Sequence, residues 1–174
     1  MNRISTIILF AMTFFMIGAV AVKNPYENIS TCFTPPQSCG DTIVSNITSA
    51  KSDIYIQAYG FTSEKIIQAL IDAKNRGVNV EVILDRSNFH HKAIATIKRL
   101  RKIGIPVYKD NVKGIAHNKV MIIDNKKVIT GSFNFTKNAD LRNAENVVII
   151  TDKEVAKRYM QNWITRLSNS ELIF

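Results

Sequence analysis

The sequence predicts a layered α/β/α domain around a mixed, largely parallel central sheet. The main observation is an alternation along the chain from residue 41 onward. Short runs rich in β-branched residues are followed by longer runs whose apolar residues recur every three or four positions, and glycines end several of these runs. The composition agrees, because 46% hydrophobic and 21% charged residues in a chain of 174 are typical of one globular domain.

The elements of the first half follow from these patterns in turn. A helix is expected at 41–50, with Asp41 as its N-cap and apolar residues at helical spacing. The run DIYIQAYG at 53–60 alternates apolar and polar residues, which predicts a strand. A helix at 63–76 ends at Gly77. The β-branched run VNVEVILD at 78–85 predicts the next strand.

The second half begins with a basic helix at 89–103, which Gly104 and Pro106 end, and a short strand at 105–108. Runs at 119–124 and 128–130 form a hairpin-like pair around a turn at 125–126, and another strand is expected at 145–151. The last helix starts at residue 152. The side chains expected on its buried side are Val155, Tyr159, Trp163, Ile164 and Leu167.

The N-terminus predicts export. Arg3 is followed by an almost wholly apolar run, and Ala19 and Ala21 supply the small residues of a signal-peptidase site, so residues 1–21 are interpreted as a cleaved signal peptide. An uncleaved membrane anchor is the alternative, because the apolar run is just long enough to span a bilayer. Both interpretations place the domain outside the cytosol, in a secreted or periplasmic location, since the positive charge precedes the apolar run.

Residues 22–40 are interpreted as a linker, and residues 41–174 as the folded domain. The linker is polar, contains three prolines and ends in the stretch CFTPPQSC. In an exported protein, Cys32 and Cys39 are expected to form a disulfide. A zinc site would need two further ligands, and no neighbouring His or Cys offers them.

The formal net charge is +9. A basic protein of this size attracts polyanions, either nucleic acid or the phosphates of an anionic membrane surface. Charge therefore suggests two classes of partner and does not separate them.

The informative stretch is GIAHNKVMIIDNKKVITGSFNF. It places His117, Lys119, Asp124, Gly131, Ser132 and Asn134 at the spacing HxK, four residues, D, six residues, GSxN. Six specified positions at roughly one chance in twenty each have odds on the order of 10⁻⁸ per starting point.

These residue types suit chemistry at phosphorus. His117 and Lys119 lie two apart on an expected strand, so their side chains should emerge on one face. A histidine neutral near pH 7 can attack phosphorus or donate a proton, and a lysine can neutralise a phosphate oxygen. After Gly131 the chain can turn tightly and present the Ser132 hydroxyl, the Asn134 amide and backbone N–H groups to the remaining oxygens.

At these residues the sequence resembles the phospholipase D superfamily, whose signature is this HKD pattern. The resemblance covers about residues 32–163 and is especially close to small exported members with one motif per chain, which include bacterial phospholipases D and a periplasmic endonuclease. It implies a phospholipase D-like fold and a phosphohistidine intermediate on His117. Lys119 and Asn134 would hold the phosphate, with Ser132 in support, and Asp124 would be structural. Glu145 matches a carboxylate that orients the histidine; the alternative is a strand-start carboxylate paired with Arg142 or a lysine.

Displacement at phosphorus also needs an acid for the leaving oxygen. Larger members of the superfamily carry two motifs per chain, whereas this chain has one. A two-fold homodimer would bring two copies of His117 to one shared site, one attacking and one donating. The alternative acid within one chain is His90 or His91.

No cofactor or metal is expected, because a two-metal phosphodiesterase needs clustered carboxylates and the motif supplies cations and amides. Hydrolysis of phosphatidylcholine to phosphatidic acid and choline is the favoured function, supported by export and by Phe89, Phe133 and Phe135 around the motif. A metal-independent endonuclease acting on DNA or RNA is the alternative, supported by the basic charge. A third interpretation is a phosphate-binding module without turnover.

Overall fold

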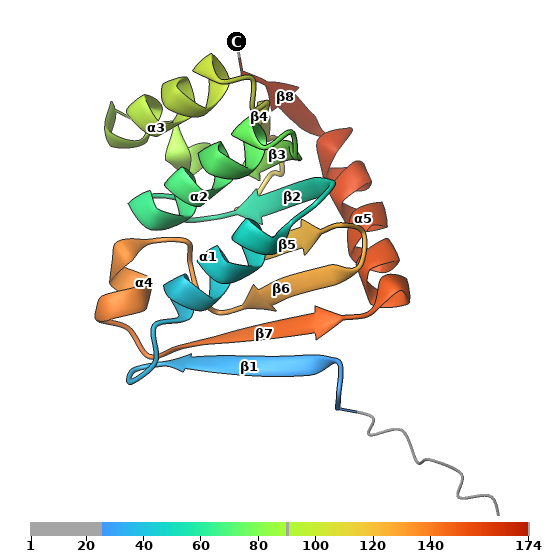
Figure 1. The fold of residues 1–174 in the computed structure, drawn as a ribbon. Coiled ribbons are helices and arrows are strands. Elements are labelled where there is room, and N and C mark those ends of the chain that lie inside the picture. The colour runs from blue at the N-terminus through green and yellow to red at the C-terminus, as the bar shows by residue number, and fades with distance from the viewer. Residues whose placement is uncertain (1–25, 90, 174) are drawn as a thin grey trace, which may run out of the picture.

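The computed structural model describes residues 26–89 and 91–173. The predicted signal peptide at 1–21 therefore lies outside the described residues, as does His90. Within the described ranges, the chain forms one eight-stranded sheet in the order β1-β7-β6-β5-β2-β3-β4-β8 (Figure 1). Its strands are β1 (Ile29–Thr34), β2 (Asp53–Ala58), β3 (Asn79–Leu84), β4 (Val107–Asp110), β5 (Lys119–Ile123), β6 (Lys127–Gly131), β7 (Glu145–Thr151) and β8 (Ser170–Leu172).

The helices cover both faces of this sheet, as the α/β/α prediction requires. They are α1 (Cys39–Ser49), α2 (Glu64–Asn75), α3 (His91–Lys102), α4 (Lys137–Leu141) and α5 (Lys153–Leu167), with a short 3₁₀ turn η1 at Arg86–Asn88. Ile54 and Ile56 of β2 pack in one core with α1 and α2, which lie in front of the sheet in Figure 1. On the other face, Val120 and Ile122 of β5 pack against Trp163 of α5.

The sheet is mixed but mostly antiparallel, so the expectation of a largely parallel sheet was wrong. Only β2–β3 and β3–β4 pair in parallel, and each pair is joined through a helix, as parallel strands require. The strands β5, β6 and β7 follow one another and pair antiparallel, and β5 also pairs antiparallel with β2. Strands and helices alternate only up to β4. The expectation of parallel pairing was wrongly extended to the later strands, where this alternation has ended.

The interpretation of residues 22–40 as a linker also needs correction. Part of this stretch is β1, which pairs antiparallel along β7 from Ile29↔Ile150 to Thr34↔Glu145. The strand was missed because only Cys32 and Thr34 of its six residues are buried, so its apolar pattern is weak. Cys32 and Cys39 form a disulfide that joins the strand to the first residue of α1.

Three smaller differences concern the end of the chain and the elements around the motif. Ile164 was expected to be buried on α5 but is 55% exposed. Ala156, which was not in the expected set, is buried. The sequence patterns did not predict α4 or β8, which have five and three residues and so carry little periodicity. Among the described residues, no helix has the length and apolar character needed to cross a membrane.

Candidate active site

The motif residues other than Asp124 lie at one edge of the sheet. Lys119, the first residue of β5, pairs with Ala58 at the end of β2, and Gly131, the last residue of β6, pairs with Val147 near the start of β7. By this edge we mean the end of the sheet at which β2 and β6 finish and β5 and β7 begin. It lies on the left in Figure 1. Residues that are far apart in sequence meet there because the strands are antiparallel.

His117 and Lys119 lie close together at this edge, although His117 is not on the strand that the spacing argument assumed. Both contact one aromatic ring: the centroids of the His117 and Tyr59 rings are 4.6 Å apart, and Lys119 Nζ lies 5.1 Å from the Tyr59 centroid. His117 precedes β5 and is exposed, whereas Lys119 is buried. The Lys119 ammonium donates a hydrogen bond to the His117 carbonyl oxygen at 2.8 Å. An accessible imidazole thus stands beside a buried cation.

Tyr59 is a site residue that sequence analysis missed. Its backbone N–H donates to Asn118 O at 2.9 Å, and its carbonyl accepts from Asn88 Nδ2 at 2.6 Å. These two bonds fix the residue between the histidine loop and η1. The available signal was an aromatic residue at a strand end just before Gly60, which is too common a pattern to indicate a site.

The environment of Lys119 suits an anion. Burial lowers the pKa of its ammonium, while the negative charge of Glu145 acts in the opposite direction. No carboxylate forms an ion pair with Lys119 within the described part of the chain. A phosphate oxygen would supply the missing countercharge.

Gly131 permits the turn that follows β6. Its φ is +144°, and a Cβ atom at this position would lie 2.2 Å from the carbonyl oxygen of Asn146, so only glycine fits. The N–H groups of Ser132 and Phe133 both point to that same carbonyl, at 3.2 and 3.4 Å. These two backbone donors are therefore occupied, contrary to the expectation that they would face a phosphate.

Asn134 follows this turn and packs against Gly60, where an added Cβ atom would lie 3.3 Å from the asparagine Oδ1. That oxygen is buried, and it has no hydrogen-bond partner among the described residues. An unpaired buried acceptor costs about 1–3 kcal/mol and calls for an explanation. A phosphate oxygen also accepts, so only the Nδ2 of Asn134, and not this oxygen, could contact a phosphate.

Glu145 lies in a hydrogen-bond cluster with Ser132. The Ser132 hydroxyl donates to Glu145 Oε2 at 2.5 Å and accepts from the Asn146 N–H at 3.1 Å. Asn143 Nδ2 donates to the other carboxylate oxygen at 2.9 Å. Among the described residues, the carboxylate therefore forms no hydrogen bond or ion pair with the partners that sequence analysis considered, which were the histidine, Arg142 or a lysine.

Asp124 lies at the opposite end of β5 from Lys119. Its carboxylate accepts hydrogen bonds from the backbone N–H groups of Lys51, Ser52 and Asp53. Burial alone would raise the pKa of this carboxyl, but those hydrogen bonds outweigh it and hold the pKa below its ordinary value. The geometry places the motif aspartate in a structural contact, away from the histidine.

Asp85, at the end of β3, holds the loop that carries the histidine. Its buried carboxylate accepts from the N–H of Ala116 at 2.7 Å, one residue before His117, and from the N–H of Ser87 at 2.8 Å. Sequence analysis had placed this residue at the end of a strand, and it also caps η1. Its second contact, to a distant loop, had no sequence signal.

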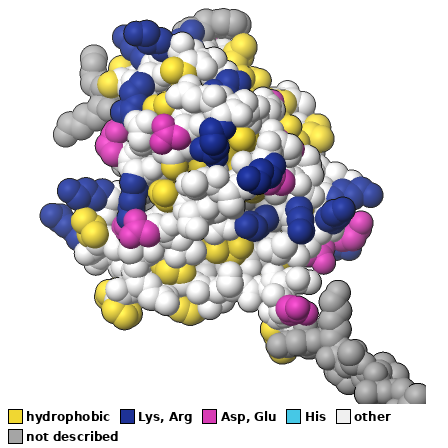
Figure 2. Space-filling view, viewed as in Figure 1, with side chains coloured by type: hydrophobic (Ala, Val, Ile, Leu, Met, Phe, Trp, Pro, Cys, Tyr) yellow, Lys and Arg dark blue, Asp and Glu magenta, His cyan; other side chains and the backbone are white. Residues whose placement is uncertain are grey.

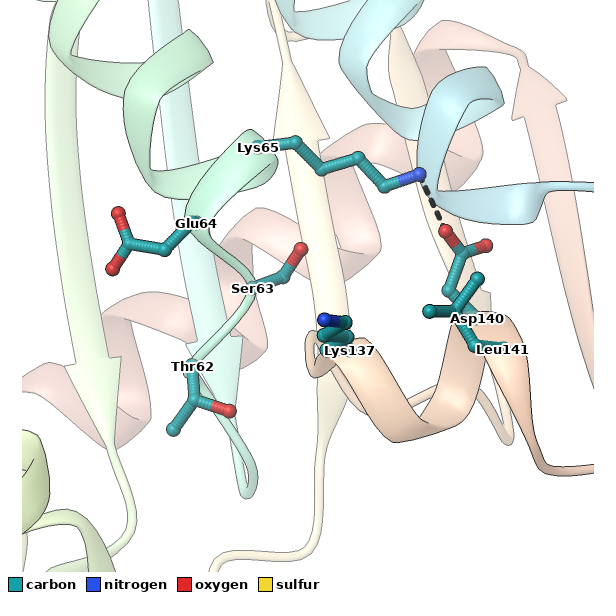
Figure 3. Close-up of a pocket in the computed structure, with 7 residues that line it drawn as sticks. All are labelled: Thr62, Ser63, Glu64, Lys65, Lys137, Asp140 and Leu141. Carbon is teal, nitrogen blue, oxygen red and sulfur yellow. Dashed lines mark ion pairs between the residues drawn. The ribbon is translucent and has the colours of Figure 1, made fainter.

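A cavity of about 370 Å³ adjoins this edge between α2 and α4 (Figure 3). Thr62 and Ser63 in its wall are tied to the Asn134 segment, because their N–H groups both donate to Phe135 O at 2.9 Å. An ion pair between Lys65 and Asp140 spans the two helices at its back. The cavity thus begins within a few residues of the candidate phosphate ligands.

Two further expectations concern groups near the motif. Phe133 and Phe135 are 2% exposed and belong to the core, so they form no apolar rim around the site. His91 begins α3, but the structure does not describe its side chain. In the described ranges, no three His, Cys, Asp or Glu side chains gather as a metal site would require.

Comparison with known proteins shows which family has this arrangement. Residues 43–167 match the family described as "Cardiolipin synthase, PLD-like domain". A phospholipase D from Rickettsia prowazekii is 53% identical over 147 residues, which make up 84% of this chain and 71% of the relative.

Two solved structures share the fold over most of the domain. The phospholipase D family member Nuc from Salmonella typhimurium has a TM-score of 0.80 at 37% identity, covering 83% of this chain and 97% of that one. NucT from Helicobacter pylori has a TM-score of 0.78 at 29% identity, covering 83% and 98%. All the candidate site residues, from Tyr59 to Glu145, lie inside the range that the family matches.

Proposed function

The chain belongs to the phospholipase D superfamily and is a phosphodiesterase of the phospholipase D or nuclease type, and from this premise we propose that it hydrolyses phosphatidylcholine to phosphatidic acid and choline. The observation that carries the mechanism is the exposed His117 imidazole beside the buried Lys119 ammonium, which has no carboxylate partner among the described residues. The similarity to a rickettsial phospholipase D favours the lipid substrate.

In the first step, His117 attacks the phosphorus of the diester while its phosphate oxygens lie against Lys119 and Asn134. A bond forms between an imidazole nitrogen and phosphorus, and the bond to the choline oxygen breaks. Choline leaves after its oxygen receives a proton. The Lys119 ammonium stabilises the charge that develops on the phosphate oxygens, and it needs no reorganisation to do so because it is already fixed.

In the second step, water attacks the phosphorus and breaks the bond to His117. Phosphatidic acid leaves, and the proton removed from water returns the acid of the first step to its starting state. Ser132 and Glu145 support the phosphate-binding turn through their mutual hydrogen bond. In the proposed mechanism, the negative charge of Glu145 also favours the protonated state of Lys119.

The acid is proposed to be His117 of a second copy in a two-fold dimer with one shared site. The single motif per chain supports this assignment, because each half-reaction needs a nucleophile or base and an acid. Mixing equal amounts of the wild type and a His117→Ala variant, with subunit exchange, tests it. With a shared site, only dimers of two wild-type chains are active, so the mixture should show about a quarter of the activity of the same amount of wild type. Independent sites predict half of that activity.

Export of the domain is also a proposal. The residues at 1–21 have the composition of a signal peptide, and the Cys32–Cys39 disulfide suits an oxidising compartment. We propose a secreted or periplasmic location, with an uncleaved anchor as the alternative.

A nuclease acting on DNA or RNA is the second candidate, and the net charge of +9 favours it. A diester in a nucleic acid presents the same tetrahedral phosphate, so the residues that contact phosphorus do not discriminate between the two substrates.

Trapping the intermediate tests the mechanism directly. The protein is mixed rapidly with short-chain phosphatidylcholine and quenched in alkali, and peptides are analysed by mass spectrometry. The proposal predicts a phosphatidyl adduct on His117 that is absent in the folded His117→Ala variant. Cleavage without any adduct, or an adduct on another residue, would contradict it.

A further inference from the structure

We propose that the sheet edge carrying the site docks on the surface of an anionic phospholipid bilayer; this inference rests on the proposed phospholipase function and names the surface by which the site reaches its substrate. The docking face has an apolar part and a basic part. Its apolar residues are Phe33, Ile115 and Leu141, and its basic residues are Lys113, Lys137 and Arg142.

The apolar residues are exposed although each is large. Phe33 is 55% exposed, Ile115 58% and Leu141 66%. Single exposed apolar residues are common on protein surfaces, but three around one catalytic edge form a pattern. They replace the buried phenylalanines at 133 and 135 that sequence analysis had expected at this rim.

These three side chains belong to segments on both sides of the candidate site. Ile115 precedes His117 by two residues, in the loop that Asp85 fixes to the end of β3. Phe33, which pairs with Asn146, lies in the edge strand β1 and points to the opposite face of the sheet from Thr34 and α4, so it flanks the site from the other face. From β3 to β1 there are five strand spacings, which is roughly 24 Å.

Leu141 joins the apolar set beside β1. Thr34 Oγ1 donates to the carbonyl oxygens of Ala139 and Asn143, which fixes the end of α4 against the end of β1. Leu141 also lies in the wall of the cavity between α2 and α4. A lipid leaving the bilayer at this point would meet Leu141 in a wall whose other lining residues are polar or charged.

The basic residues of the face are exposed and have no carboxylate partners. Within the described residues, the side chains of Lys113, Lys137 and Arg142 form no ion pair. Figure 2 shows Lys and Arg side chains next to hydrophobic ones at the left of the view, over α4, with Asp or Glu side chains beside them, and further exposed hydrophobic side chains at the end of β1. The face is thus both cationic and apolar.

This combination fits an anionic lipid surface better than a nucleic acid. Lysine and arginine near an anionic bilayer are attracted to its headgroups, and exposed aliphatic and aromatic side chains insert below them. A protein surface that binds nucleic acid uses cations and stacking aromatic rings. The exposed aliphatic side chains of Ile115 and Leu141 would contribute nothing to such binding. We therefore assign the face to a bilayer.

The test measures binding to vesicles of phosphatidylcholine with phosphatidylglycerol, using full-length protein in the His117→Ala background so that the lipid stays intact. The double variant Phe33→Ser/Ile115→Ser should bind on the order of 100-fold more weakly, since each side chain contributes on the order of 10-fold. Ile164→Ser is the matched control, because Ile164 is also 55% exposed but lies on α5. It should bind like its parent.

Charge is tested separately with Lys137→Glu, which should weaken binding to the anionic vesicles and make little difference with phosphatidylcholine alone. Equal binding by the double variant and the Ile164→Ser control would overturn the proposal. Loss of the dimer in the double variant, or an equal loss of DNA binding, would overturn it as well, because the face would then serve a second copy or a nucleic acid.

A soluble diester, bis(4-nitrophenyl) phosphate, separates this inference from the proposed function. With His117 restored, Phe33→Ser/Ile115→Ser should cleave the soluble diester at the wild-type rate but hydrolyse vesicles more slowly. If the wild type cleaves neither substrate, the proposed function fails; if it cleaves both and the double variant matches it on vesicles, only the docking face fails.

Discussion

Replacing Asp124 with asparagine should separate the structural part of the motif from the chemical part. Asp124 and Asn125 have φ values of 53° and 48°, and Lys126 N–H donates to Ile123 O at 3.1 Å, so the two residues form the tight turn between β5 and β6. Asparagine tolerates this left-handed backbone as well as aspartate does. Asp124→Asn therefore removes the charge and keeps the shape.

The expected loss follows from the hydrogen bonds. The carboxylate accepts from three backbone N–H groups and from the Ser52 hydroxyl. Bonds to a charged acceptor contribute about 1 kcal/mol more than neutral ones, but this group is partly exposed, so we expect a total loss of about 2 kcal/mol in the free energy of unfolding. Urea denaturation should show the midpoint falling by about 1 M.

The loss should depend on pH. The pKa of Asp124 is lowered in the folded protein, so its stabilising contribution is complete above the unfolded value of about 3.9 and disappears as pH falls through the lower folded value. The wild type and Asp124→Asn should therefore differ fully at pH 7 and converge in acid. Asp72→Asn is the control, since Asp72 accepts one bond from the Gln68 side chain at an exposed position and should change little.

Activity per folded molecule should stay at the wild-type level in Asp124→Asn. Five strand residues separate the carboxylate from the lysine end of β5, a distance of roughly 17 Å. Unchanged stability, or a loss of turnover greater than the loss of folded protein, would refute the structural assignment.

Three other changes have defined outcomes. Gly131→Ala should cost about 3 kcal/mol or more in urea denaturation, because its Cβ would meet a carbonyl oxygen, whereas Gly114→Ala, with open space around it, should not; equal stability of the two would contradict this. Lys119→Met should lower kcat/KM for a soluble diester on the order of 100-fold. The wild-type rate should decline as pH rises through the lowered lysine pKa, and this decline should be missing from the residual rate of Lys119→Arg. An unchanged rate or pH profile would count against the phosphate role. Replacing Cys32 and Cys39 with serine should lower the unfolding free energy by about 2 kcal/mol through loss of the short loop closure, and a melting temperature unaffected by the change or by reductant would refute this.

Much of the fold was predictable because its signals are local. β7 was predicted at its observed bounds, and the last helix begins within one residue of its predicted start, with Asp152 capping α5 through a hydrogen bond from the Val155 N–H. The direction of the strands was not predictable in the same way. It depends on which strands become neighbours, and the pairing of β2 with β5 joins residues more than sixty positions apart.

The candidate site shows the same difference between what local sequence signals predict and what depends on long-range contacts. The spacing of His117, Lys119 and Asn134 predicted a common location, and the structure places them at one sheet edge. Tyr59 and Asp85 were missed as site residues because their roles depend on contacts with the histidine loop across the fold. The phenylalanines near the motif were misplaced for a related reason, since an apolar residue next to a site is equally suited to the core and to a rim.

The central claim is that His117 performs metal-independent cleavage of a phospholipid diester. One matched assay in EDTA tests it most directly: the wild type and the folded His117→Ala variant each receive phosphatidylcholine vesicles and plasmid DNA, with choline release and DNA nicking scored side by side. We expect choline release by the wild type that disappears in the variant. Nicking of DNA without choline release would contradict the lipid substrate, and equal cleavage by the variant would contradict the histidine mechanism itself.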